Sequence, residues 1–379
     1  MPKKTHLYRF HKGGKLIEFS GFEMPLWYKG IVEEHGAVRN SVGIFDVSHM
    51  GRLLIEGRDA TKFLDFILPT NVEKMKDSRA FYSAICNERG GIIDDSVTNR
   101  FSSSKYMMVV NAANIEKDLR WLESHASGFE VSISNSSENS ALIAIQGPLA
   151  RATLQKICDV DLGSMKRFAF SNAKVAGVEC IVSRTGYTGE DGFEITVLDT
   201  PLDSPAKAER VWESLLEAGK EYSIQPCGLG ARDLLRLEAG MCLYGQDLND
   251  DITPIEASLS SIVSQEKSVE YVGRKVIDEQ IRNGTSRIRV GFVMTEDGIP
   301  RHEFDVVLGG VKVGVVTSGS FSPILKKGIG MAYVPRALSE IGQKFMIRIR
   351  NLEREAQVTR MPFYDTSKYG ITRKTSSST

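Results

Sequence analysis

Two adjacent carboxylates, Asp94 and Asp95, are the residues of this sequence with the clearest capacity for chemistry. They follow the apolar pair Ile92-Ile93, and a strand-like run, residues 106–111, comes shortly afterwards. Because burying a carboxylate beside apolar strand segments is costly, at least one of the two aspartates is expected to have a chemical task. The alternative is an exposed turn, in which Asp is common. The pair alone leaves both interpretations open.

Several familiar chemistries lack their motifs in this sequence. There is no G-x-x-x-x-G-K-[ST], no H-E-x-x-H and no G-x-S-x-G, and Gly228-x-Gly230 lacks the third glycine of a dinucleotide fingerprint. The six histidines are scattered, so no metal site is predicted. What remains is carboxylates, tyrosines, an arginine and two glycine-rich loops, residues 184–194 and 228–233. These residues suit binding a polar heterocycle and stabilising a cation better than attacking an acyl group.

Composition favours neither a nucleic-acid nor a membrane partner. The 379 residues carry 48 Lys+Arg and 48 Asp+Glu, so no net field attracts polyanions. No apolar run approaches the roughly 20 residues of a membrane helix, and no apolar stretch typical of a secretory signal follows the polar N-terminus. The five cysteines are an odd number without a C-x-x-C. We therefore expect a cytoplasmic protein with reduced cysteines, folded as two or three domains.

The apolar pattern predicts several strands and a separate C-terminal module. Strands are expected at residues 51–57, 141–145, 177–183 and 192–197. From about Arg287, short apolar or alternating runs are separated by glycine-rich turns, which predicts a small all-β sandwich or barrel. The tail, residues 366–379, holds little apolar surface and is expected to be mobile.

Helices are predicted where a capping residue precedes apolar residues at helical spacing. Asp59, Asn114 and Ser204-Pro205 are the expected start signals. A further helix around residues 234–237 would end at Gly240. The apolar faces expected for the second and third helices are Ile115, Leu119 and Leu122, and Ala208, Val211, Trp212 and Leu215, the third helix stopping at Gly219.

Seven blocks of the sequence, in this order, resemble the T-protein family of the glycine cleavage system, whose members are tetrahydrofolate-dependent aminomethyltransferases. The resemblance extends from about Leu7 to Tyr364, with one departure: Gly21-Phe22-Glu23 precedes Met24-Pro25 where the family often has Gly-Trp. The matching blocks are residues 45–51, 87–95, 109–112, 146–148, 183–194, 228–233 and 244–247.

The resemblance implies an α+β fold of three domains, arranged as a cloverleaf of mixed and antiparallel sheets around a central folate channel. Residues 1–50 and 141–275 would form a discontinuous folate-binding domain. Residues 51–140 would form an inserted α+β domain that carries the aspartate pair, and residues 276–365 would form the C-terminal β-barrel. The all-β module predicted independently from residue 287 agrees with this arrangement.

The implied reaction moves an aminomethyl group from the lipoyl arm of a lipoylated H-protein, a transient partner, to tetrahydrofolate. The products are 5,10-methylenetetrahydrofolate and ammonia. A fixed carboxylate in a poorly hydrated channel would stabilise the positive charge that develops and could orient a folate nitrogen. The resemblance assigns this catalytic role to Asp95. It leaves Asp94 a structural role, for which a turn hydrogen bond is the expected contact.

Two charged residues are implied as folate contacts. Glu194 would accept from the adjacent N–H and NH2 of the pterin edge in a bidentate way, and the alternative is a surface strand end. Arg232 would pair with a ligand carboxylate or lie against an aromatic ring. Its alternative is a structural bridge to Asp233 or Glu238.

Three polar side chains, Tyr82, Asn111 and Tyr187, would line the folate channel, although isolated tyrosines are more often core residues. A further ring contact falls near residues 165–168, and the sequence leaves it open between Arg167 and Phe168.

Two alternative functions remain on the same resemblance. One is a folate-dependent demethylase of similar fold. The other is a non-enzymatic folate-binding relative that assists iron–sulfur assembly or RNA modification, which is marked by a Cys-Tyr-x-Gly-Gln motif. Here Cys242 is followed by Leu243, so that motif is incomplete and Cys242 is interpreted as a buried small residue.

Overall fold

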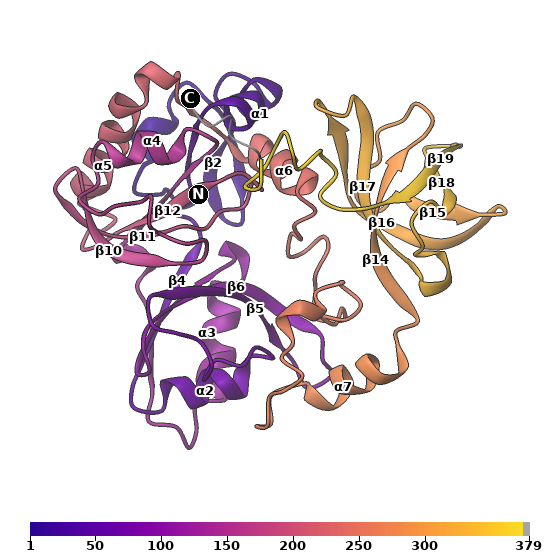
Figure 1. Ribbon diagram of the computed structural model, residues 1–379, viewed down its shortest axis with the longest axis horizontal. Coiled ribbons are helices and arrows are strands. Elements are labelled where there is room, and N and C mark those ends of the chain that lie inside the picture. The colour runs from indigo at the N-terminus through magenta and orange to yellow at the C-terminus, as the bar shows by residue number, and fades with distance from the viewer. Residues whose placement is uncertain (374–379) are drawn as a thin grey trace.

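The computed structural model describes residues 1–373. Figure 1 shows three lobes: one around a six-stranded sheet, one around a five-stranded sheet, and a C-terminal barrel. Helix α6 (Leu229–Glu238) lies between the first lobe and the barrel. No helix in this part of the chain is long and apolar enough to span a bilayer.

The first lobe is built on a sheet with the strand order β10-β11-β12-β9-β3-β13. Its neighbours pair antiparallel except β13, which is parallel to β3. The strands are β3 (Gly43–Asp46), β9 (Ala141–Gln146), β10 (Phe170–Val175), β11 (Val178–Ser183), β12 (Gly192–Val197) and β13 (Gln225–Pro226). A short hairpin, β1 (Lys15–Phe19) and β2 (Phe22–Trp27), lies beside this sheet near α6.

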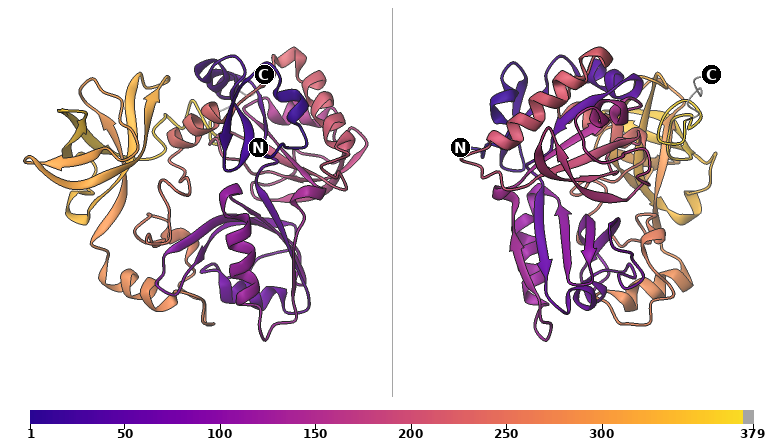
Figure 2. Two further views of the ribbon diagram at one scale, coloured as in Figure 1. Left: turned by 180° about the vertical axis from the view of Figure 1, so that it is seen from behind. Right: turned by 60° about the vertical axis from the view of Figure 1, so that its left-hand side comes forward.

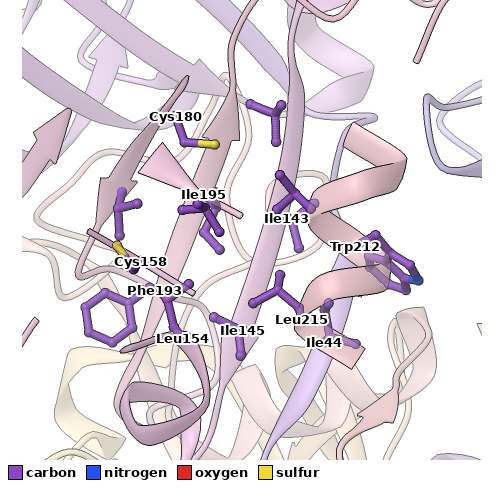
Figure 3. Packing of buried hydrophobic residues seen from close by; sticks show 14 of the residues in the cluster. Ile44, Ile143, Ile145, Leu154, Cys158, Cys180, Phe193, Ile195, Trp212 and Leu215 are labelled. Atoms are coloured by element: carbon purple, nitrogen blue, oxygen red, sulfur yellow. The ribbon is translucent and has the colours of Figure 1, made fainter. Parts of the chain in front are cut away.

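Helices cover both faces of this sheet. Helices α4 (Ala150–Gln155) and α5 (Ala206–Ala218) bury their apolar residues against one face, where Trp212 and Leu215 meet Ile143 and Ile145 (Figure 3). Helices α1 (Ile31–Asn40) and α6 (Leu229–Glu238) contribute to a second cluster on the other face, because successive residues of β3 point to opposite sides.

The second lobe holds the aspartate pair. Its sheet has the order β5-β6-β7-β4-β8 and packs on helices α2 (Ala60–Ile67) and α3 (Ile115–Ser124) through a continuous apolar cluster. The strands are β4 (Gly51–Glu56), β5 (Arg79–Cys86), β6 (Ile92–Ser102), β7 (Lys105–Val110) and β8 (Ser132–Asn135).

Helix α7 (Arg274–Asn283) leads into a closed barrel with the strand order β14-β17-β16-β15-β18-β19. The all-β module predicted from residue 287 is thus confirmed. The barrel strands are β14 (Arg287–Met294), β15 (Asp305–Leu308), β16 (Val311–Ser322), β17 (Lys327–Pro335), β18 (Lys344–Ile349) and β19 (Leu352–Thr359).

After the barrel the chain returns to the first lobe beside α6 (Figures 1 and 2). The Phe363 amide donates to the Glu238 carbonyl at 2.8 Å, and the Ile371 amide donates to Gly189 at 3.0 Å. Buried Glu190 accepts from Arg39 at 2.8 Å and also from Arg373. The segment that follows the barrel therefore braces the glycine-rich loop of residues 184–194. Part of the predicted tail, residues 374–379, lies outside the described residues.

Most predicted elements are present, with three corrections at helix starts, the first being that Pro205 and not Ser204 occupies the N-cap position of α5. The face of α5 is buried as predicted, and Gly219 is its C-cap. Asp59 and Asn114 occupy the N-cap positions of α2 and α3, but neither side chain caps its helix. Tertiary partners take these side chains instead: Asp59 accepts from the Glu130 amide at 3.0 Å, and Asn114 Nδ2 donates to Asp94 at 2.8 Å. Helix α6 ends at Glu238, two residues before the predicted Gly240.

Candidate active site

The two aspartates lie inside strand β6, not in an exposed turn. Asp94 and Asp95 pair with Ile85 and Ala84 of β5. Asp94 is fully buried, whereas Asp95 is partly exposed. The exposed-turn interpretation of the pair is therefore wrong, because β6 continues through both residues as a paired strand of the sheet.

Asp94 fastens the segment that follows β7. Its carboxylate accepts the Asn111 amide N–H at 2.9 Å, Asn111 Nδ2 at 2.7 Å and Asn114 Nδ2 at 2.8 Å. The expected turn hydrogen bond is thus replaced by three bonds to a distant segment.

Asp95 is held by two neutral donors. Tyr82 Oη donates to Asp95 Oδ2 at 2.8 Å, and Asn111 Nδ2 donates to Oδ1 at 2.9 Å. Burial, followed by the charge of Asp94, raises the pKa of Asp95 to about 7, against the opposing effect of these hydrogen bonds. Within residues 1–373 no basic side chain forms an ion pair with Asp95. Its negative charge is therefore not neutralised and can act on a positive charge in a ligand.

Glu194, on strand β12, and Arg232, in the first turns of α6, form a second group with Tyr187. Thr185 Oγ1 donates to Glu194 Oε2, which fixes one oxygen of that carboxylate. The Arg232 guanidinium lies 4.9 Å from the centroid of the Tyr187 ring, a cation–π contact. Burial lowers the pKa of Arg232, while Glu194 and Tyr187 act to raise it.

Arg232 has an unused donor. Its Nη1 is buried and has no hydrogen-bond partner among the described residues. The predicted alternative, a structural bridge from Arg232 to Asp233 or Glu238, is not found among the described residues, because both carboxylates pair with other arginines. Asp233 accepts from Arg236 at 2.8 Å, and Glu238 accepts from Arg39 at 2.9 Å.

Tyr187 lies near enough to both groups for its phenol to interact electrostatically with Asp95 and with Arg232. Its hydroxyl donates to the carbonyl of Cys242. Burial and then the Asp95 charge raise the pKa of Tyr82, to which Cys242 and Tyr187 also contribute. The six residues singled out from the sequence therefore lie as two neighbouring clusters, Asp95–Tyr82–Asn111 and Glu194–Arg232–Tyr187.

A cavity of about 500 Å³ opens beside Tyr82. Of the six predicted site residues, Tyr82 alone lines this cavity. Phe168 lines it, in a left-handed backbone conformation with φ 57°, and Arg167 does not. Its lining residues are Lys74, Met75, Lys76, Arg79, Ala80, Phe81, Tyr82, Phe168, Ser261 and Ile262.

Asn114, Asp118 and Thr185 lie beside the predicted site residues and were not predicted as members of the site. Asn114 and Asp118 are one helical turn apart on α3, and both are buried. Asp118 stands at the i+3 position from Ile115 and the i−4 position from Leu122, so helical spacing places it beside the apolar face. A carboxylate at such a position in the sequence was the signal that could have identified Asp118. The described residues contain no group of three or more His, Cys, Asp or Glu side chains that could hold a metal ion.

Comparisons with known proteins agree with this architecture. The family model described as GCVT N-terminal domain matches residues 6–267, and the one described as glycine cleavage T-protein C-terminal barrel domain matches residues 287–365. An aminomethyltransferase of Caldanaerobacter subterraneus subsp. tengcongensis is 46% identical over 365 residues, covering 96% of each chain. One from Thermoanaerobacter pseudethanolicus is 44% identical over 366 residues, covering 96% of this chain and 97% of that protein.

A solved structure gives the same result. The glycine cleavage system aminomethyltransferase T from Bartonella henselae superposes with a TM-score of 0.89 at 34% identity, covering 98% of this chain and 100% of that one. The predicted α+β class with a C-terminal barrel is confirmed. Since the family models and relatives of high coverage agree, the chain belongs to the glycine cleavage T-protein family of aminomethyltransferases.

Proposed function

We propose that this protein moves the aminomethyl carbon from the lipoyl arm of an H-protein to tetrahydrofolate, giving 5,10-methylenetetrahydrofolate and ammonia. Membership of the family supports the reaction class. The observation that carries the proposal is Asp95: a partly exposed carboxylate held by Tyr82 and Asn111, with no cation paired to it in the described chain.

The chemistry needs a fixed negative charge. Positive charge develops on the one-carbon fragment as its bond to sulfur or nitrogen breaks, and a preorganised carboxylate in a poorly hydrated site stabilises that charge without reorganising. Tyr82 and Asn111 hold both oxygens of Asp95 in place. A pKa near 7 also lets Asp95 exchange a proton with a folate nitrogen or the departing amine at neutral pH.

The second cluster suits the pterin. Thr185 occupies one oxygen of Glu194, and the carboxylate keeps further lone pairs for a bidentate contact with an N–H and NH2 edge. The unpartnered Nη1 of Arg232 is a buried donor that a ligand acceptor would satisfy. Both features support folate as the acceptor substrate, with Tyr187 beside the guanidinium.

We further propose that the protein works in the cytoplasm. In the described residues all five cysteines are free and buried, which suits a reducing compartment.

The test is Asp95→Asn, which removes the charge and keeps the shape. With aminomethyl-loaded H-protein and tetrahydrofolate, kcat is expected to fall by about a hundredfold or more, because the charge acts mainly in the transition state. The dissociation constant for tetrahydrofolate, measured by calorimetry, is expected to stay within about threefold.

The matched control is Asp203→Asn, at an exposed aspartate outside both clusters, which is expected to leave both quantities unchanged. Near-normal turnover by Asp95→Asn would remove the proposed role of the carboxylate. Turnover of N-methylated amino acids in place of loaded H-protein would instead identify a demethylase.

A further inference from the structure

Asp118 is a buried carboxyl group that the proposed chemistry does not use. It lies on helix α3 with 0% of its surface exposed. Neither carboxyl oxygen receives a hydrogen bond from any N–H or O–H in the described chain. An ionised carboxylate in such a place, with no donor and no cation, would cost several kcal/mol. The protonated carboxyl group avoids that cost, and its O–H can donate a hydrogen bond.

The group that faces Asp118 is Asp94. Asn114, at the N-cap position of α3, donates to Asp94, and Asp94 is the largest influence on the pKa of Asp118 after burial, so the two carboxyl groups are neighbours. One proton shared between neighbouring carboxyl groups avoids placing two negative charges side by side. Asp94 already accepts three N–H donors whereas Asp118 accepts none, so the proton belongs on Asp118.

The other charged and titratable groups around Asp118 do not neutralise it. Lys117, its neighbour, donates to the Ile93 carbonyl at 2.6 Å, to Tyr244 Oη at 2.7 Å and to Asp250 at 3.3 Å. Burial, Asp94 and Asp95 together outweigh the effect of Lys117 and raise the pKa of Asp118 to about 11.

We propose that Asp118 is a protonated positioning residue, whose O–H donates to Asp94 and thereby fixes the carboxylate that holds Asn111 against Asp95. The proposed Asp118–Asp94 bond would extend two observed hydrogen bonds, from Asn111 to Asp94 and from Asn111 to Asp95, back to helix α3. A neutral Asp118 also prevents a third negative charge from accumulating beside Asp95. The positioning role rests on the proposed function, whereas the protonated state does not.

The first test is the pH dependence of stability in Asp118→Asn, whose amide copies a neutral carboxyl. Above about pH 4 the unfolded wild type is ionised at position 118 while the folded state stays protonated, so wild-type stability falls as pH rises. Asp118→Asn lacks this titration. Its urea midpoint is expected to rise relative to that of the wild type between about pH 5 and about pH 8. A difference that stays flat or reverses would overturn the neutral state.

The second test observes the proton directly. The infrared spectrum of the wild type at about pH 9, where Asp95 is ionised, is expected to keep the carbonyl stretch of one protonated carboxyl group that Asp118→Asn lacks. Asp65→Asn is the matched control: Asp65 is also buried, but it pairs with Lys267 at 2.9 Å, so no such band should disappear. Should Asp118→Asn fail to fold, the band and its shift in D2O are followed in the wild type alone. Absence of the band contradicts the proposal.

The third test separates positioning from packing. Asp118→Leu keeps the branched shape and loses the donor, so kcat is expected to fall about tenfold while the KM for tetrahydrofolate stays within about twofold. Asp118→Asn, which restores a donor, is expected to recover most of this loss. Equal kcat values for the two variants would overturn the positioning role. A wild type with a protonated Asp118 but no aminomethyl transfer would count against the proposed function alone.

Discussion

Replacing Asp95 by Asn is expected to make the stability of the protein, relative to that of the wild type, increase as pH rises through about 7. The pKa of Asp95 rises from 3.8 to about 7 because of burial and Asp94, so the folded state binds a proton that the unfolded state has lost. The contribution of Asp95 is therefore fully present below about pH 4 and is lost as pH rises through about 7. A pKa difference of one corresponds to about 1.4 kcal/mol, so the loss of folding free energy reaches about 4 kcal/mol. This is an upper limit, because the side chain is partly exposed.

The amide also has a cost that does not depend on pH. Asn111 Nδ2 donates to Asp95 in the wild type, and an NH2 group placed opposite it would lose that bond, at about 1–3 kcal/mol. The signal is therefore the slope of the difference, not its value at one pH.

Urea unfolding of the wild type and Asp95→Asn at several pH values provides the assay. The free energy of unfolding of the variant, relative to the wild type, is expected to increase by about 2–4 kcal/mol from about pH 4 to about pH 8. Asp203→Asn, at an exposed aspartate, should show a flat difference. A flat difference for Asp95→Asn as well would refute the raised pKa and, with it, the account of an unneutralised charge in the site.

Three further predictions concern the residues around Asp95 and the pterin cluster. Activity is expected to rise with pH through about 7 as Asp95 ionises. Tyr82→Phe removes a hydrogen bond that lowers the pKa of Asp95, so this rise in the pH–activity profile should move to higher pH. A move to lower pH would contradict the assignment of the rise to Asp95. Glu194→Gln should weaken tetrahydrofolate binding about tenfold or more in calorimetry, since an amide cannot accept both hydrogens of the pterin edge; unchanged affinity would exclude that contact. Arg232→Leu should weaken the same binding by about tenfold while raising the urea midpoint, because it removes a buried cation with an unmet donor; a lower midpoint would mean that Arg232 is mainly structural.

The sequence was informative where local pattern and tertiary environment agree. Alternating apolar residues from 287 onward predicted an all-β module because each barrel strand has one buried face. The face of α5 was predicted fully, since a helix on a sheet must bury one stripe. The insertion of the second lobe into the first came from family resemblance, because periodicity carries no information about which strands share a sheet.

Prediction failed where a polar side chain has a distant partner. Asn114 has the residue type and position of a helix cap, yet its amide donates to Asp94 from another element. The aspartate pair was ambiguous for the same reason, because the donors that make burial tolerable, Asn111 and Tyr82, lie 16 and 13 residues away in sequence. Asp118 was missed because its burial depends on Asp94, a residue of another element, which helical spacing does not show. Local spacing cannot reveal such contacts, whereas the full-length resemblance could indicate Asp95 itself.

The brace between Arg373 and Glu190 has a consequence for how the protein is made. Glu190 belongs to the loop that precedes Glu194, but one of its two cations comes from beyond the barrel. During synthesis that loop must wait until the barrel and the segment after it have left the ribosome. A chain truncated after β19 would contain every residue assigned to catalysis or pterin binding. It would lack Arg373, however, so the buried Glu190 carboxylate would keep only Arg39 as its counter-charge.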